Sequence, residues 1–185
     1  GMANVYNNLG VLFDDQSDYK KALEYYNKSY DAFNHLENKD GMAVAINNIG
    51  FIYKKQKNYD KAVKHFENAL KIQIEIGNDH DAAYAYNNLG QSWKLKGDYG
   101  KANEYYNKAI RIHEKIGNKK GLSLAYQNMA NLFIDQGMFN KSYDYAYKAF
   151  EIAKEITYPS SIENSARILS QIYEEQGKHK GALTM

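Results

Sequence analysis

The chain has 185 residues, 24 of them basic and 22 acidic, so its formal net charge at pH 7 is +2. This near balance argues against a nucleic-acid partner, because binding phosphates requires a concentrated positive surface. The chain has no cysteine, which excludes disulfides, thiolate nucleophiles and thiolate metal sites.

No apolar run approaches the ~20 residues that a membrane-spanning helix needs. Residues 1–20 also lack the basic and apolar segments of a signal peptide. Gly1-Met2 resembles a cloning remnant, and the sequence stops at Met185 inside an expected helix. We therefore expect a soluble segment of a longer protein with no membrane contact, cytoplasmic or periplasmic according to the parent sequence.

A four-residue motif recurs every 40 residues along the chain. It reads NNLG at 7–10, NNIG at 47–50, NNLG at 87–90, and more loosely QNMA at 127–130 and RILS at 167–170. A fixed period of this length indicates a repeat array, in which each unit packs only on its neighbours. The sequence thus predicts a single array over 1–185, with units near 2–41, 42–81, 82–121, 122–159 and a truncated 160–185.

Each unit has the pattern of two antiparallel helices. In the third unit, apolar or small residues three and four apart predict a first helix, which Gly97 ends and after which Asp98 caps a second. Met138 stands where the fourth unit needs its cap. We expect first helices near 2–15, 42–56, 82–96, 122–136 and 160–176. Second helices are expected near 18–36, 58–76, 98–116 and 139–156, with the start of a further one at 178–185.

Seven positions in register resemble the tetratricopeptide repeat family, whose pattern combines aromatic residues, Leu-Gly and alanines. The third unit carries them as Tyr86, Leu89, Gly90, Trp93, Ala102, Tyr106 and Ala109. The resemblance implies an all-α fold, an α-α superhelix of antiparallel helix pairs whose concave face binds a peptide or helix of another protein. The long period looks like the subgroup found in kinesin light chains, Leu-Gly-Asn repeat adaptors and bacterial sensor regions.

A turn of ~100° per residue places a second set of side chains on the side of each first helix that faces away from its partner. Asparagines recur there, and a primary amide can hold the backbone of an extended peptide. The alternatives are that these asparagines bond a neighbouring helix, or were copied when the unit duplicated, and that the apolar members are buried between first helices. The predicted groove residues are Asn8, Asn48, Phe51, Lys55, Tyr84, Asn88, Gln91, Leu95, Leu124, Asn128 and Asn131.

Basic side chains gather near the ends of the first helices of the second and third units. They would suit a partner with an acidic segment. The alternative is that they complement the helix dipole as solvated helix ends. The lysines concerned are Lys54, Lys55, Lys57, Lys94 and Lys96.

Catalysis finds no support in the sequence, and we expect no enzyme, no cofactor and no metal. The five histidines occupy unrelated repeat positions without the i,i+4 spacing of a helical metal site, so we expect them at the surface. Two other functions stay open. One is a sensory or regulatory segment of a larger bacterial signalling protein. The other is self-assembly through the C-terminal unit, whose Leu169 and Tyr173 would lack cover.

Overall fold

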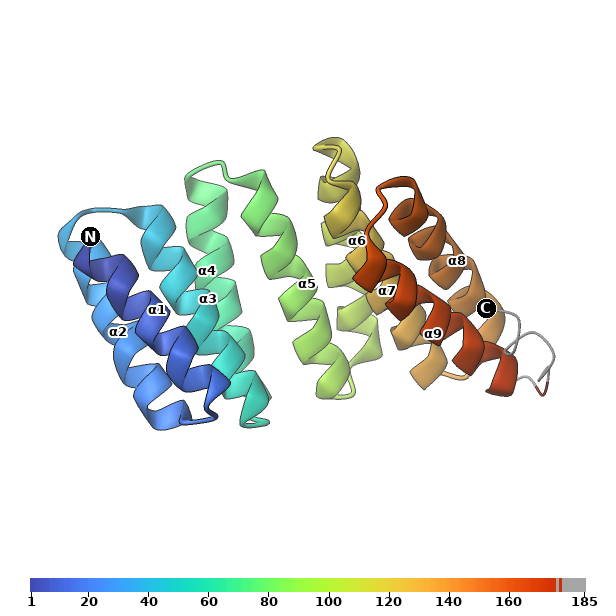
Figure 1. Cartoon of the computed structure of the whole chain (residues 1–185), viewed down its shortest axis with the longest axis horizontal. Coiled ribbons are helices and arrows are strands. Elements are labelled where there is room, and N and C mark those ends of the chain that lie inside the picture. Colours follow the sequence, from blue (N-terminus) through green and yellow to red (C-terminus); the bar gives the residue numbers. More distant parts are fainter. Residues whose placement is uncertain (176, 178–185) are drawn as a thin grey trace. The chain divides into compact units, whose positions relative to one another are not determined.

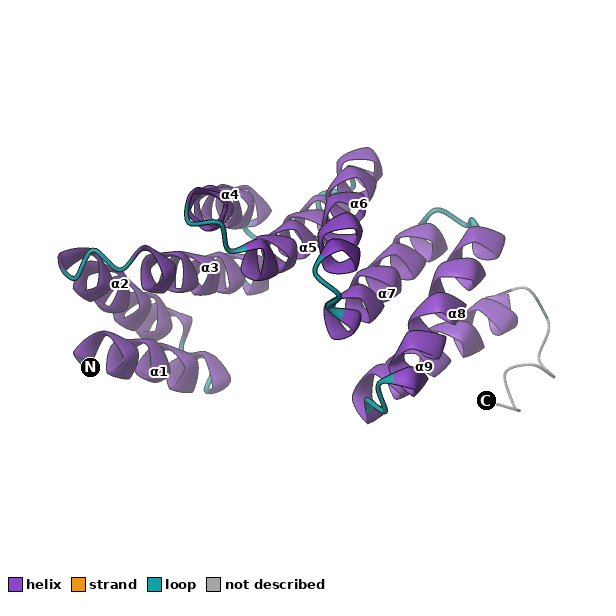
Figure 2. Cartoon of the chain, turned by 90° about the horizontal axis from the view of Figure 1, so that it is seen from above, coloured by secondary structure: helices purple, strands orange, loops and turns teal. Residues whose placement is uncertain are grey.

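The computed structural model describes residues 1–175 and 177, and within them the chain forms α-helices and no strand (Figures 1 and 2). The helices fall into two compact units, Gly1–Lys96 and Gly97–Met185, which we treat separately. The assignment of all five repeats to one array therefore stays a prediction.

Unit 1 contains α1 (Met2–Asp15), α2 (Tyr19–His35), α3 (Lys39–Lys55), α4 (Tyr59–Glu75) and α5 (Asp79–Leu95). Each helix packs on the next one along the chain, as Figure 1 shows for α1 with α2 and for α3 with α4. Three-residue turns such as 16–18 and 56–58 join them, so consecutive helices run antiparallel. From α2 to α5 the helix starts are 20 residues apart, which produces the 40-residue period of the sequence.

Unit 2 contains α6 (Tyr99–Lys115), α7 (Lys119–Asp135), α8 (Phe139–Glu155) and α9 (Pro159–Glu175). In this unit α6 packs on α7, α7 on α8 and α8 on α9, and α9 also contacts α7. The predicted helix over 178–185 lies outside the described residues.

Three of the first helices begin earlier than predicted. The cause is an asparagine cap at Asn38, Asn78 and Asn118, which the predicted helix starts did not take into account. Each side-chain Oδ1 accepts from the backbone N–H three residues on, at 2.8 Å for Gly41, 3.1 Å for Asp81 and 2.9 Å for Gly121. The helices α3, α5 and α7 accordingly begin at 39, 79 and 119. Met138 makes no side-chain cap before α8, as its sequence predicts.

The Leu-Gly half of the repeat motif brings the two helices of a unit together. Gly50 of α3 lies under the ring of Phe66 of α4, so closely that a Cβ on Gly50 would stand 2.8 Å from that ring. Gly10 has the same relation to Tyr26, with 2.5 Å. Leu89 and Ala102 are fully buried. The small residue is thus required by packing, and the Leu-Gly pair has a structural role.

The sequence predicts that the apolar face of α9, the first helix of the fifth repeat, lacks cover. This prediction is wrong. Leu169 of α9 is fully buried in a cluster with Ile168, Ile172, Ala130 and Ala146. Tyr173 is half-buried, with its ring 6.0 Å from that of Tyr143. Packing of α9 against both α7 and α8 provides this cover.

Candidate functional site

Asparagines link the first helices of unit 1. Asn48 Nδ2 of α3 donates to Asn7 Oδ1 of α1 at 2.9 Å, and Asn88 Nδ2 of α5 donates to Asn47 Oδ1 of α3 at 3.1 Å. Asn8 of α1 is exposed. The alternative that these asparagines bond a neighbouring helix is therefore what the structure shows for Asn48 and Asn88. Each of the two still has a second amide hydrogen and a carbonyl oxygen that could bind a ligand.

Two further predicted groove residues are also engaged in contacts between first helices. Lys55 of α3 forms an ion pair with Asp14 of α1 at 2.6 Å. Gln91 of α5 accepts a hydrogen bond from Lys54 of α3 through its Oε1. These contacts favour a structural role for both lysines over the recognition of an acidic partner.

Lys54 is the least solvated of these lysines. Its Nζ lies 4.5 Å from the ring centre of Phe51 and 6.0 Å from that of Phe66. Burial, and to a lesser degree the neighbouring charge of Lys55, lower the pKa of Lys54 to about 8. The sequence interpretation, which treated it as one of several solvated cations, missed this environment.

The apolar residues predicted for the groove of unit 1 differ in exposure. Phe51 is half-buried and meets Phe66 edge to face at 5.3 Å. Tyr84 is half-buried and lies 5.1 Å from the ring of His80. Leu95, at the end of α5, is 46% exposed. Only Leu95 of the three is open enough to receive a partner without rearrangement.

In unit 2 the asparagine row changes character. On α7, Asn128 and Asn131 are half-buried and Leu124 is 40% exposed. Gln127, the counterpart of Asn7 and Asn47, is buried, and its Nε2 lies 2.9 Å from Ser165 Oγ of α9. Ile168 of α9 stands at the repeat position of Asn48, Asn88 and Asn128 and is buried.

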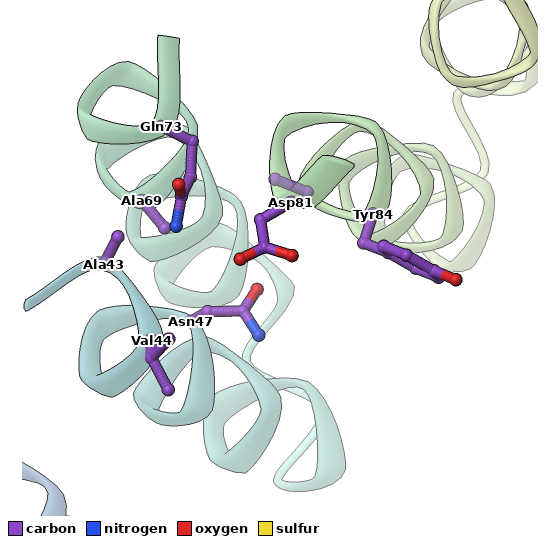
Figure 3. Close-up of a pocket in the computed structure, with 8 residues that line it drawn as sticks. Ala43, Val44, Asn47, Ala69, Gln73, Asp81 and Tyr84 are labelled. Atoms are coloured by element: carbon purple, nitrogen blue, oxygen red, sulfur yellow. The ribbon is translucent and has the colours of Figure 1, made fainter. Parts of the chain in front are cut away.

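A pocket of about 180 Å³ lies between α3, α4 and α5 (Figure 3). Gln73 of α4 is 4% exposed, and its Oε1 has no hydrogen-bond partner among the described residues. Asn47 and Asp81 face each other across the pocket, while the ring of Tyr84 points away from Gln73 (Figure 3). The lining residues are Ala43, Val44, Asn47, Ala69, Gln73, Asp81, Tyr84 and Ala85.

An equivalent pocket of about 210 Å³ lies 40 residues earlier, between α1, α2 and α3. Phe33 stands there in the place of Gln73, and Gly41 in the place of Asp81. A Cβ on Gly41 would lie 2.3 Å from Phe33 Cδ1, so the ring occupies the space next to the glycine. The sequence interpretation missed both pockets, although comparing residues 33 and 73 across the period could have indicated them.

His113 of α6 takes the same repeat position in unit 2. It is fully buried, and its ring Cε1 lies 2.3 Å from where a Cβ on Gly121 would stand. The prediction that all the histidines lie at the surface is therefore wrong for His113. Among residues 1–175 and 177, no group of three or more His, Cys, Asp or Glu side chains is placed to hold a metal ion. No helix in that part of the chain has the length and apolar character needed to span a bilayer.

Comparisons with known proteins agree with this architecture. The chain superposes on BtubC (BKLC) from P. vanneervenii with a TM-score of 0.82 and 20% identity, covering 95% of this chain and 73% of that one. For a STAND protein with a tetratricopeptide repeat sensor from Pyrococcus horikoshii, the TM-score is 0.82, the identity 18% and the coverage 98% and 29%. The Rap conjugation gene regulator of the plasmid pLS20, in complex with the Phr* peptide, matches with a TM-score of 0.82 and 18% identity, covering 96% and 49%.

At these identities the likeness concerns the fold. No curated protein sequence matches the chain. Sequence models of the tetratricopeptide repeat match residues 3–34 and 41–115, which together make up more than half of the chain. The chain belongs to the tetratricopeptide repeat family, with the all-α fold of antiparallel helix pairs that its sequence predicts.

Proposed function

We propose that this chain is a non-catalytic protein-interaction module, and that the first helices α1, α3 and α5 of unit 1 bind an extended peptide or helical segment of a partner protein. The row of half-buried amides on these helices carries the proposal. Asn48 and Asn88 use one amide hydrogen each to reach the preceding first helix. Their remaining hydrogen and carbonyl oxygen suit the alternating N–H and C=O groups of a peptide backbone.

The energetic cost of an asparagine at Asn8 also supports a role in binding. Asparagine inside a helix is less favourable than alanine by roughly 0.6 kcal/mol. One inter-helix hydrogen bond returns about 1 kcal/mol, which offsets that cost for Asn48 and Asn88. Asn8 is exposed and takes no part in the two inter-helix bonds, so they do not offset its cost. A ligand contact would supply one.

The fold comparison is compatible with this proposal. The Rap regulator of pLS20, which shares this fold over 96% of the present chain, was solved with the Phr* peptide bound. A fold of this kind therefore accommodates a peptide in at least one other protein. For the present chain, peptide binding and its place on α1, α3 and α5 are our proposal.

The proposal is tested by selecting peptides from a displayed random library on the 185-residue chain and measuring the affinity of the tightest one. Asn48→Ala combined with Asn88→Ala should weaken it by about tenfold or more, because two side-chain hydrogen bonds of roughly 1 kcal/mol each are lost. Asn8→Ala alone, which removes no inter-helix bond, should weaken binding by several-fold.

The matched control replaces two asparagines exposed on second helices, Asn34 on α2 and Asn68 on α4, by alanine. This control should bind the peptide like the unmodified chain. Thermal unfolding of every variant separates lost binding from lost structure. Unchanged affinity in both the Asn48 and Asn88 double variant and the Asn8 variant, or an equal loss in the control, would count against the proposal.

A further inference from the structure

We infer that the pocket between α3, α4 and α5 is a subsite for a cationic side chain, a guanidinium group on an aliphatic stem, carried by the bound segment. This inference rests on the proposed function and assigns a chemistry to one place on its surface. It starts from Gln73, a buried carboxamide that the helix packing leaves incompletely bonded.

Hydrogen-bond acceptors surround the pocket. Gln73 Oε1 is buried and has no partner among the described residues. Asn47 Oδ1 accepts one hydrogen bond, from Asn88, and can accept a second. Asp81 receives Asn78 Nδ2 at 3.1 Å and lies 2.7 Å from His80 Nδ1, and its two oxygens have further lone pairs. No lysine or arginine is among the lining residues. A ligand that donates several N–H groups fits this arrangement.

Negative charge collects at the same end of the helices. Asp79 and Asp81 stand in the first turn of α5, and Asp40 in the first turn of α3. Asn78 donates to Asp40 at 3.2 Å as well as to Asp81, and so holds the two carboxylates near one amide. First-turn acids also complement the helix dipole, which explains the aspartates by themselves. The helix dipole does not explain why the oxygen of Gln73 is unbonded, because Gln73 lies near the C-terminal end of α4 and not in a first turn.

The remaining walls suit an aliphatic stem. Ala43, Val44, Ala69 and Ala85 line the pocket with methyl groups and offer no hydrogen bond through their side chains. The volume of about 180 Å³ is room for several water molecules at roughly 30 Å³ each. Arginine combines methylene groups with a planar fork of five N–H donors, which can reach acceptors on three helices at once.

The other repeats show that folding does not require Gln73. At the equivalent boundary of α2 and α3, Phe33 closes against Gly41, and in unit 2 His113 closes against Gly121. A ring and a glycine therefore fill this position twice in the chain. At the α4–α5 boundary a carboxamide and a carboxylate replace them, so the pocket there is lined with acceptors where the pocket beside Phe33 and Gly41 has a ring. Compared with a ring and a glycine, Gln73 and Asp81 make less apolar contact and add hydrogen-bond acceptors. Recognition of a cation needs such acceptors.

The test uses amide NMR on the 185-residue chain, titrated with N-acetyl-arginine methylamide. The expected result is a saturable shift of the Gln73 side-chain amide and the Asp81 backbone amide. N-acetyl-citrulline methylamide, which has the same shape without the charge, should bind at least fivefold more weakly. N-acetyl-norleucine methylamide should produce no saturable shift at these positions. Equal binding of the arginine and citrulline probes, or no shift at Gln73 and Asp81, would overturn the inference.

The matched variant carries Gln73→Phe with Asp81→Gly, a pair that the chain already packs at Phe33 and Gly41. It should bind the arginine probe at least tenfold more weakly. Asp81→Asn, which keeps an oxygen for Asn78, should weaken binding several-fold and serves if the double variant does not fold. Undiminished binding in either folded variant would contradict the inference. If the probe binds but the Asn48 and Asn88 variant keeps its peptide affinity, the proposed function fails and the pocket stands. If the probe does not bind but the Asn48 and Asn88 variant loses peptide affinity, the pocket inference fails and the proposed function stands.

Discussion

The α2–α3 boundary and the α4–α5 boundary occupy equivalent places one repeat apart, but different side chains close them. At the first, the ring of Phe33 fills the space above Gly41. At the second, Gln73 and Asp81 bring polar groups into the same space, and the Oε1 of Gln73 has no partner among the described residues. The repeat thus fixes the position of each helix and leaves the chemistry between helices free to vary.

The contacts between first helices differ in the same way. Lys55 of α3 reaches α1 through an ion pair with Asp14 that is open to solvent on the lysine side. Lys54 of α3 reaches α5 through a neutral acceptor, Gln91, and loses much of its hydration against Phe51 and Phe66. The α1–α3 contact is therefore a partly solvated ion pair, whereas the α3–α5 contact places the ammonium of Lys54 where its hydration is poor.

The largest expected effect is that of truncating the two equivalent residues. Phe33→Ala should lower the free energy of unfolding by about 3 kcal/mol or more, because a buried ring leaves a cavity. Gln73→Ala should cost about 1 kcal/mol, because the change also removes an unsatisfied oxygen. Urea unfolding followed by circular dichroism measures both. Equal losses would erase the distinction between the boundaries.

Adding a methyl group tests how closely the first boundary is packed. Gly41→Ala should destabilise the chain by about 1 to 3 kcal/mol, since the new Cβ would stand 2.3 Å from Phe33 Cδ1. Gly100→Ala on α6 is the control. Its nearest neighbour would be Asp98 Oδ1 at 3.6 Å, so it should gain up to about 1 kcal/mol from helix propensity. Combining Gly41→Ala with Phe33→Leu should recover part of the loss, and no recovery would place the clash elsewhere.

Lys54, in the contact between α3 and α5, makes the free energy of unfolding depend on pH. Its pKa in the folded chain is about 8, below the ordinary value of 10.5, so the unfolded chain binds more protons in the interval between them. Stability should therefore rise with pH across that interval. Relative to Lys54→Met, the unmodified chain should gain about 1 to 2 kcal/mol between pH 8 and pH 9.5, measured by urea unfolding. Parallel pH profiles for the two proteins would show that Lys54 is solvated.

The smallest expected effect concerns Gln73 itself. Gln73→Leu should raise the free energy of unfolding by about 1 kcal/mol, because it replaces a buried oxygen without a partner by an apolar group of similar size. The same change at a satisfied carboxamide would be destabilising. Gln127→Leu provides that comparison, since the Nε2 of Gln127 lies 2.8 Å from Ser161 Oγ. A loss of stability for Gln73→Leu would mean that its oxygen is already bonded.

The sequence predicted the fold well because the period and the packing residues coincide. Gly97 ends a helix with a φ of 85°, and Leu89 and Gly90 are buried where the motif places them. The starts of α3, α5 and α7 were placed too late. Asparagine occurs both at helix ends and as a cap, and only the backbone N–H hydrogen bonds that the side chains of Asn38, Asn78 and Asn118 accept decide between the two.

The candidate site was less predictable. Helix geometry identified the first-helix asparagines, but it could not say that Asn48 and Asn88 donate to the preceding helix, because that depends on how neighbouring units pack. Gln73 escaped notice because a single polar residue on a second helix resembles any solvated one. Its burial depends on α5, and on an unusual pair of residues at a position that Phe33 and His113 fill with rings.

A crystal structure of the 185-residue chain with its selected peptide would test the account most directly. The account predicts that the peptide backbone contacts the amides of Asn48 and Asn88, and that a basic side chain of the peptide enters the pocket beside Gln73 and Asp81. A peptide seated on the second helices α2 and α4, with that pocket unchanged, would contradict it.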